Sequence, residues 1–348
     1  MSEATLDELG GWPAVLGPLT SGDDLSAAQA RAAMATILAG DATDAQIAAF
    51  IIALRAKGET VDEMVGLIEA MQSAATAVPV NDVRGVVDTC GTGGDRSQSI
   101  NVSTIAALVV AGAGARVCKH GNRAASSACG SADLLEALGV AIDIEPEVVA
   151  RCVDEAGIGF CFAPRFHPAM RHAIPVRREL GVPTVFNFLG PLANPARVRR
   201  QVLGVSDARM ADKMAGVLAR LGSERALVVY GHDGLDELTT TTSSSVVELD
   251  ERGELIRYDV DPAAYGLRTV KADELRGGGA AINAGAARAV LSGAAGPHRD
   301  VVVLNAAAAL MAAGLAADLH AGLELAAAAI DDGRASAALD ALVRVSHS

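Results

Sequence analysis

The chain of 348 residues is long enough for one large domain or two compact lobes. Hydrophobic residues make up 51% of it and charged residues 20%, which excludes a disordered chain. The net charge of −13 and an aromatic content of 3% argue against a nucleic-acid partner, so an anionic ligand would have to be held by local groups.

Targeting signals, membrane spans and metal-binding cysteines are not expected. The N-terminus is acidic and has no basic segment, which argues against a signal peptide. The longest apolar run, residues 301–317, contains Asn305 and is interpreted as a strand that continues into a buried helix. The five cysteines form no Cys-x-x-Cys pair, as is typical of reduced thiols. We therefore expect a cytoplasmic protein with no membrane partner.

Residues 1–78 are predicted to be helical. Three patterns typical of helix N-termini each precede a run with apolar residues at helical spacing: Thr5/Glu8, Thr43/Gln46 and Thr60/Glu63. Pro79 then breaks the helical pattern. We therefore place the end of a small helical domain at residue 78.

Strands and helices alternate from residue 85 onward. The predicted strands cover residues 85–89, 115–121, 140–144 and 158–162, and the predicted helices cover 103–114, 132–139 and 145–157. This alternation favours an α/β fold, in which a mostly parallel sheet is covered by helices beside the small all-helical lobe.

Residues 164–195 interrupt this alternation, with several prolines and little strand character. We expect this segment to complete the helical domain, whereas the rest of residues 79–348 forms the α/β domain. The later elements are predicted as a helix over 209–222, strands over 225–231, 244–250, 255–260 and 300–305, and alanine-rich helices after them.

A glycine-rich loop, Gly-Thr-Gly-Gly-Asp at residues 91–95, follows the first predicted strand and leads toward a helix. In this arrangement backbone N–H groups and the helix N-terminus can bind phosphate. Asn101, Ser103 and Thr104 stand at the predicted helix start, where they could cap the helix or bind the ligand. The loop matches neither the dinucleotide-binding fingerprint nor the P-loop, so an ordinary glycine turn with a helix cap is the alternative.

Two further loops follow predicted strands and carry charge. Lys119 and Arg123 could hold an anion, although a polar surface loop would look similar. Asp236 and Glu237 are adjacent carboxylates that suit Mg²⁺, which usually takes one or two carboxylates with substrate phosphate. A solvated acidic turn is the alternative for that pair. Because ligands bind at the carboxyl ends of parallel strands, the loops together favour a site for a phosphate compound.

Two arginines in the proline-containing segment could bind a carboxylate. Arg177 and Arg178 offer the planar guanidinium groups that pair with carboxylates in bidentate geometry. The alternative is a helix face that makes surface ion pairs. His167 and His172 have no zinc-site spacing and are interpreted as packing residues.

Six segments resemble the anthranilate phosphoribosyltransferase family of tryptophan biosynthesis, in the family's order: GTGGD, NVST, KHGNRAASS, RHAIPVRRELGVPTVFNFLGPLANP, DGLDELTTTT and LRGG. The resemblance implies a Mg²⁺-dependent reaction of anthranilate with phosphoribosyl pyrophosphate (PRPP), which gives N-(5-phosphoribosyl)anthranilate and pyrophosphate. It also implies a homodimer that associates through the helical lobe. Partnership with an anthranilate synthase amidotransferase subunit is left open.

The resemblance also implies residue roles. Lys119, Asp236 and Glu237 would serve catalysis, while Ser103, Asp236 and Glu237 would hold two Mg²⁺ ions per subunit. The residues implied to surround PRPP are Gly91, Gly94, Asp95, Ser99, Asn101, Val102, Ser103, Thr104, Lys119, His120, Gly121, Asn122, Arg123, Ala124, Ala125, Ser126, Ser127 and Ser131. Those implied to line the anthranilate path are Gly91, His120, Asn122, Met170, Arg177 and Arg178.

One residue departs from the family pattern. Arg96 stands where many members carry glycine, so it adds a cation and removes backbone freedom.

Three other functions compete with this one. They are a pyrimidine nucleoside phosphorylase of the same superfamily, a transferase for another aromatic acid, and a non-catalytic protein on this scaffold. The Asp236/Glu237 pair argues against the first, and its presence together with Lys119 argues against the third.

Overall fold

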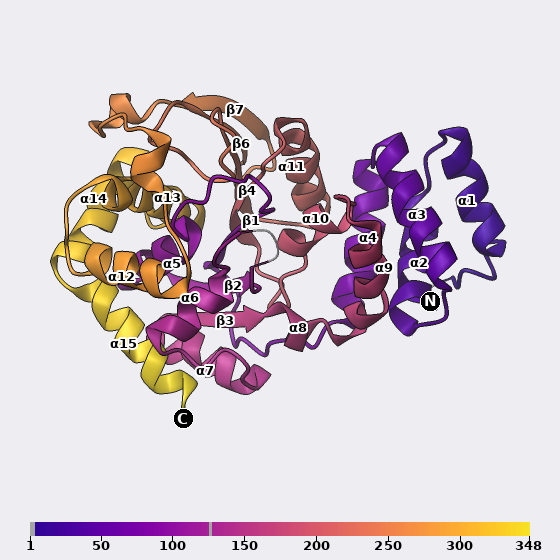
Figure 1. Cartoon of the computed structure of the whole chain (residues 1–348), viewed down its shortest axis with the longest axis horizontal. Coiled ribbons are helices and arrows are strands. Elements are labelled where there is room, and N and C mark those ends of the chain that lie inside the picture. The colour runs from indigo at the N-terminus through magenta and orange to yellow at the C-terminus, as the bar shows by residue number, and fades with distance from the viewer. Residues whose placement is uncertain (1–3, 125–126) are drawn as a thin grey trace.

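The computed structural model describes residues 4–124 and 127–348. Four N-terminal helices form one end of the molecule (Figure 1): α1 (Gly11–Ser21), α2 (Ala27–Ala39), α3 (Asp44–Lys57) and α4 (Val61–Ala74). Thr43 and Thr60 cap α3 and α4 as the sequence predicts, and Ser26 caps α2 in the same way. Thr5 and Glu8 also exchange hydrogen bonds, but a turn follows them and α1 begins only at Gly11.

The proline-containing segment supplies short helices that pack on this helical lobe. They are α9 (Ile174–Leu180), α10 (Phe186–Leu189) and the 3₁₀ helices η1 (Pro168–His172) and η2 (Gly190–Leu192), whereas α8 (Ala163–Phe166) packs on the strand Ile158–Phe162. Val176 and Phe186 are buried in the same apolar cluster as Phe50 of α3 and Leu67 of α4. Helix α9 contacts α3, and Figure 1 shows it within the helical lobe.

The rest of the chain is built on a seven-stranded sheet of order β3-β2-β1-β4-β5-β6-β7. Its strands are β1 (Val86–Gly91), β2 (Arg116–Gly121), β3 (Ile158–Phe162), β4 (Arg200–Gly204), β5 (Arg225–Gly231), β6 (Ser244–Leu249) and β7 (Leu255–Val260). β1 to β5 pair in parallel, whereas β6 and β7 are antiparallel. The predicted α/β class with a mostly parallel sheet is confirmed.

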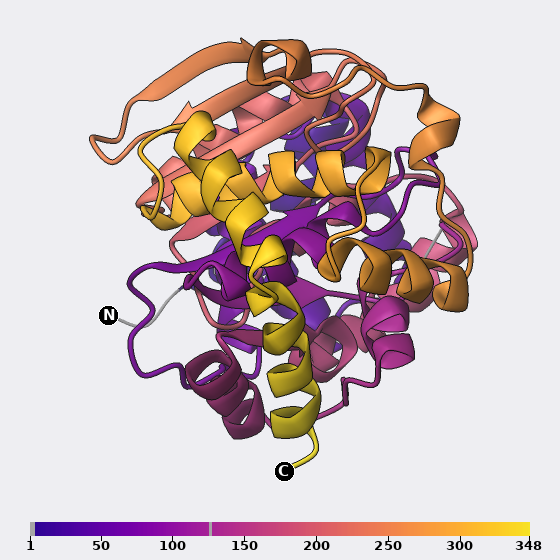
Figure 2. The same ribbon diagram turned by 90° about the vertical axis from the view of Figure 1, so that its left-hand side faces the viewer.

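Helices cover both faces of the sheet. On one face lie α5 (Val102–Gly112), α13 (Pro297–Ala313), α14 (Leu319–Asp331) and α15 (Arg334–Ser346). Figure 2 shows the three C-terminal helices of this face from outside. On the other face α7 (Pro146–Ala156) packs on β3 and α11 (Ala211–Arg220) packs on β5 and β6. The remaining helices are α6 (Ser131–Leu138), α12 (Ala280–Leu291), η3 (Ala208–Met210), η4 (Pro262–Tyr265) and η5 (Ala272–Leu275).

The sequence misplaces three elements. Residues 300–305, predicted as a strand, belong to α13, which starts with Pro297 in its first turn. Val301 to Ala312 are all buried, so the run has no polar face that would reveal a helical period. Residues 140–144, also predicted as a strand, form irregular chain, and Arg200–Gly204, for which the sequence predicts no strand, form β4.

Candidate active site

The loops after β1, β2 and β5 meet at the carboxyl edge of the sheet. The glycine-rich loop after β1 turns through four residues with positive φ: Gly93, Gly94, Arg96 and Gln98. Residues 275–277 run beside the loop and hold it, because the Gly277 N–H donates to the Gln98 carbonyl (2.8 Å) and the Ile100 N–H donates to the Leu275 carbonyl (3.1 Å). The loop is therefore fixed at its far end before α5 begins.

The predicted carboxylate pair is tied to both ends of the glycine loop. Asp236 Oδ2 accepts from the Gly93 N–H (2.7 Å), and Glu237 Oε1 accepts from the Ser103 N–H (3.1 Å). The sheet approaches Asp236 so closely that a Cβ on Gly91 would lie 2.2 Å from its Oδ2. The structure thus brings Gly91, Ser103, Asp236 and Glu237 together, although they lie more than 140 residues apart at the extremes.

Both carboxyl groups are held in an environment that disfavours their charge. Burial raises the pKa of Asp236 to about 6, and the charge of Asp95 adds to this effect. Burial also raises the pKa of Glu237 well above its usual range, with further contributions from Asp236 and Asp95. Such crowded acidic oxygens fit a divalent cation, which would offset their repulsion.

The donor set suits Mg²⁺ better than a metal caged by protein alone. Among the described residues no group of three or more His, Cys, Asp or Glu side chains converges on one metal position. Two carboxylates that leave the remaining positions to water and substrate phosphate are the usual arrangement for Mg²⁺.

Lys119 supplies the positive charge beneath the loop. Its side chain is buried, and Nζ donates to the Thr89 carbonyl and lies 3.5 Å from Ser103 Oγ. The charge of Lys119 opposes the rise in the pKa of Glu237. Of the predicted catalytic residues, Lys119 and Glu237 therefore contact Ser103 at the start of α5, and Asp236 lines the same small pocket as Ser103.

Two buried histidines lie behind Lys119. The His120 ring lies 5.1 Å from that of His167, and its Nδ1 faces the Gly190 carbonyl at 3.1 Å. Burial lowers the pKa of His120 to about 3, so this ring is neutral at physiological pH. Nε2 of each histidine is buried and has no hydrogen-bond partner among the described residues, which leaves two polar atoms available to a ligand.

The loop after β2 is arranged differently from the expected anion site. Arg123 pairs with Asp133 and Glu136 (2.9 Å each), so its charge is already neutralised in this structure. Ser131 Oγ donates to the Asn122 carbonyl, and Ser127 Oγ donates to the Cys129 carbonyl. Ala124 is exposed, and the predicted contacts of Ala125 and Ser126 lie outside the described residues.

The remaining predicted PRPP residues form the walls of the loop and the first turn of α5. Gly94 and Ser99 belong to the loop, and Gly121 ends β2. Val102 and Thr104 are buried in α5 and support the loop from below. Asn101 is held from two sides, since it donates to the Cys129 carbonyl (2.9 Å) and its Oδ1 accepts from Asn283 (2.8 Å).

The predicted carboxylate-binding arginines differ in exposure. Arg177 is half-buried, its guanidinium stacks on the Phe186 ring at 4.9 Å, and burial lowers its pKa. It makes no ion pair with the described acidic residues. Arg178 is exposed on α9, whereas Met170 is half-buried beside His167 and Leu38. Arg177 is therefore the arginine better prepared to receive a carboxylate.

Three buried polar residues support the site and were not identified from the sequence. Asp88 in β1 accepts from the His120 N–H (3.2 Å) and from Asn194 Nδ2 (2.8 Å). Asn283 connects the Gly278 N–H to Asn101. For Asp88 and Asn283 the sequence signal is a polar side chain inside an otherwise apolar strand or helix, which is costly unless it is bonded. Asn194 lies in irregular chain and has no such signal.

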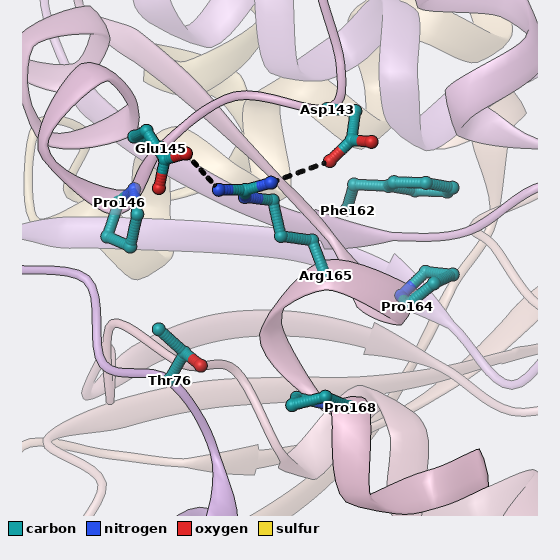
Figure 3. A pocket seen from close by; sticks show the side chains of 8 residues that line it. All are labelled: Thr76, Asp143, Glu145, Pro146, Phe162, Pro164, Arg165 and Pro168. Carbon is teal, nitrogen blue, oxygen red and sulfur yellow. Dashed lines mark hydrogen bonds and ion pairs between the residues drawn. The ribbon is translucent and has the colours of Figure 1, made fainter.

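A separate pocket lies apart from this cluster. Its volume is about 410 Å³. Figure 3 shows its lining side chains, among them Thr76, Phe162 and Arg165. Arg165 already pairs there with Asp143 (3.2 Å) and with Glu145. This pocket consequently offers no unpaired cation to a phosphate compound.

Arg96 is strained by its backbone conformation, with φ at 60°. We expect Arg96→Gly to raise the free energy of unfolding by about 1 kcal/mol, because glycine adopts this region without a Cβ penalty. Thermal and urea denaturation would measure the change. Arg96→Ala removes the same charge but keeps the Cβ, so an equal gain for both variants would contradict the backbone explanation.

Comparison with known proteins first identifies the class. Residues 83–336 match the glycosyl transferase family, a/b domain, and residues 13–75 match the glycosyl transferase family, helical bundle domain. Two relatives named anthranilate phosphoribosyltransferase come from Arthrobacter sp. (strain FB24), 53% identical over 97% of this chain and 96% of the relative, and from Thermomicrobium roseum, 54% identical over 95% of each. The chain belongs to the anthranilate phosphoribosyltransferase family.

Solved structures agree with this assignment. The anthranilate phosphoribosyltransferase of Thermus thermophilus superposes with a TM-score of 0.91 at 43% identity, over 96% of this chain and 99% of that one. The enzyme of Saccharomyces cerevisiae in complex with PRPP and Mg gives 0.88 at 27% identity, over 97% and 98%. Among the described helices of the present chain, none has the length and apolar character of a membrane span.

Proposed function

We infer that the protein transfers the phosphoribosyl group of PRPP to the amine of anthranilate and releases pyrophosphate, as a step of L-tryptophan biosynthesis. The observation that carries this inference is the convergence of Lys119, Asp236 and Glu237 on the glycine loop. The family relatives share this activity by name, and one relative has been solved in complex with PRPP and Mg. The reaction is that of a Mg²⁺-dependent pentosyltransferase.

The glycine loop and the start of α5 would hold the pyrophosphate group of PRPP. Ser103, Asp236 and Glu237 are the residues we assign to Mg²⁺, with two ions per subunit. Bound Mg²⁺ supplies positive charge that stabilises the departing pyrophosphate. Lys119 adds a fixed positive charge under the same group, and its burial strengthens that interaction.

The chain contributes position and electrostatics to the transfer, and we assign no protein nucleophile to it. Direct attack of the amine on ribose C1, opposite the leaving pyrophosphate, gives inversion at that carbon. We propose that the ortho carboxylate of anthranilate accepts the amine proton, because the nearby His120 has a pKa too low for an efficient base at neutral pH. Holding both substrates in line accounts for a large share of the acceleration.

Arg177 is proposed to receive the anthranilate carboxylate. Arg177→Ala is expected to raise the KM for anthranilate by roughly 10- to 100-fold, because a charge-assisted hydrogen bond is lost, while the KM for PRPP changes far less. Arg177→Lys keeps the charge without the bidentate geometry, so we expect an intermediate KM. Steady-state kinetics with each substrate varied in turn tests this, and equal increases in both KM values would refute the assignment.

The loss of anthranilate fluorescence with PRPP and Mg²⁺ tests the proposed function directly. We expect loss only when all three components are present, together with release of pyrophosphate. Phosphorolysis of a pyrimidine nucleoside, or turnover of another aromatic acid without turnover of anthranilate, would instead favour one of the competing transferase functions. Absence of turnover with all of these substrates would favour a non-catalytic protein.

We also propose a cytoplasmic homodimer that associates through the helical lobe. Ile174 and Val182 support this, since both are exposed apolar side chains on or next to α9. Partnership with an anthranilate synthase amidotransferase subunit is not part of the proposal.

A further inference from the structure

Asn305 is a polar residue in the middle of a buried apolar helix. It lies in α13, where its neighbours from Val301 to Ala312 are all apolar, and its exposed fraction is only 4%. A buried amide is costly unless its donor and acceptor groups are bonded. Asn305 therefore requires a structural reason beyond the packing of α13.

The Asn305 side chain holds the main chain directly after the carboxylate pair. Its Oδ1 accepts from the Leu238 N–H (3.0 Å), and its Nδ2 donates to the Leu238 carbonyl (2.8 Å). Nδ2 also donates to the Val301 carbonyl one helical turn earlier (2.9 Å). The amide thus bonds both main-chain groups of the residue that follows Glu237, much as a neighbouring strand would.

The loop that carries Asp236 and Glu237 is held on its other side by the sheet. A Cβ on Gly204 would lie 1.5 Å from the Asp236 carbonyl oxygen, so the end of β4 touches the loop backbone. Asn305 also lines a small cavity with Asp236, Glu237 and Ser103. The loop is therefore fixed between the edge of the sheet and one side chain of α13.

We propose that Asn305 is a positioning residue for the metal-binding carboxylate pair, because its amide fixes the main chain at Leu238 and so sets the direction of Glu237. This rests on the proposed role of Asp236 and Glu237 as Mg²⁺ ligands. Asparagine suits the task because it donates and accepts at one end of a short side chain, which leucine cannot do. Groups behind metal ligands tune metal affinity by fixing the ligands.

Metal binding to the intact protein tests the proposal without relying on turnover. Mn²⁺ replaces Mg²⁺ as the probe, and free Mn²⁺ is measured by electron paramagnetic resonance with pyrophosphate present. We expect Asn305→Leu to raise the Mn²⁺ concentration for half-saturation by roughly 10-fold. Leu310→Val, a cavity-forming change elsewhere in α13, should lower Tm but leave Mn²⁺ binding unchanged.

Each outcome decides the proposal. Unchanged Mn²⁺ binding in Asn305→Leu, or an equal loss in Leu310→Val, would overturn it. If Asn305→Leu does not fold, Asn305→Ser keeps a polar group and admits water, and we expect a smaller shift in the same direction; no shift in that variant would also overturn it. Because the probe is Mn²⁺ with pyrophosphate, these results stand even if the wild-type protein fails to turn over anthranilate.

Discussion

Asp236→Asn and Glu237→Gln are each expected to lower kcat by about 100-fold and to raise the Mg²⁺ concentration needed for half-maximal rate. The amides keep the shape of the carboxylates and can still accept from the Gly93 and Ser103 N–H groups, so the loop should retain its position. What is lost is the negative charge that attracts the cation. Initial rates measured over a Mg²⁺ series, with PRPP and anthranilate saturating, test this expectation.

Asp236→Asn should also raise the free energy of unfolding when no metal is present. The pKa of Asp236 is raised to about 6 by burial, so its ionised form destabilises the folded state at higher pH. The loss of unfolding free energy relative to Asp236→Asn is greatest at pH values above about 6, where Asp236 is ionised in both states. It decreases as the pH falls from about 6 toward 4, because the folded state then takes up a proton. It disappears below the pKa of the unfolded chain, near 4. We expect Asp236→Asn to be more stable than wild type by about 2 kcal/mol at pH 8 in EDTA.

A parallel fall in stability and activity would contradict this expectation, because it would mean that the substitution simply disrupts the loop. The opposite pattern, a more stable but inactive protein, is typical of a charged group retained for function. Denaturation at pH 8 and at pH 4 provides the internal comparison, since the difference between the two proteins should fall to a small fraction of its pH 8 value at the lower pH.

The sequence predicts those parts of the site that lie on loops after strands. Lys119 lies within β2, two residues before its carboxyl end, and Asp236 follows β5, so the rule that ligands bind at the carboxyl ends of parallel strands predicts that the two side chains lie close together. The sequence also predicts where α3 and α4 begin, because a capping-box pattern precedes apolar residues at helical spacing in each of them.

The parts that could not be predicted depend on contacts between distant segments. Residues 300–305 were assigned to a strand because a helix buried on all sides has no polar face. The sequence also does not identify Asn305 as a functional residue, because its partner Leu238 lies 67 residues away along the chain. Arg123 is a second case, because its pairing with Asp133 and Glu136 depends on how the chain folds back after Cys129.

Gly204 is expected to be the glycine least tolerant of substitution near the site. An added Cβ would lie 1.5 Å from the Asp236 carbonyl oxygen and 2.4 Å from its carbon. The end of β4 cannot move away, because it is paired in parallel with both β1 and β5 at the centre of the sheet. The Asp236 segment must therefore shift, which displaces the carboxylate pair that the Gly93 and Ser103 N–H groups hold.

Gly204→Ala should accordingly lower kcat by about 100-fold or more, since displacement of a catalytic group by about 1 Å has an effect of this size, and it should lower Tm as well. Gly285→Ala is the matched control, because this glycine lies within α12 and an added Cβ meets no atom within 4 Å. We expect the control to keep full activity and to gain about 0.5–1 kcal/mol of stability from the higher helix propensity of alanine. Full activity in Gly204→Ala would show that the Asp236 loop can relax away from the sheet, and the positions of Asp236 and Glu237 would then not depend on β4.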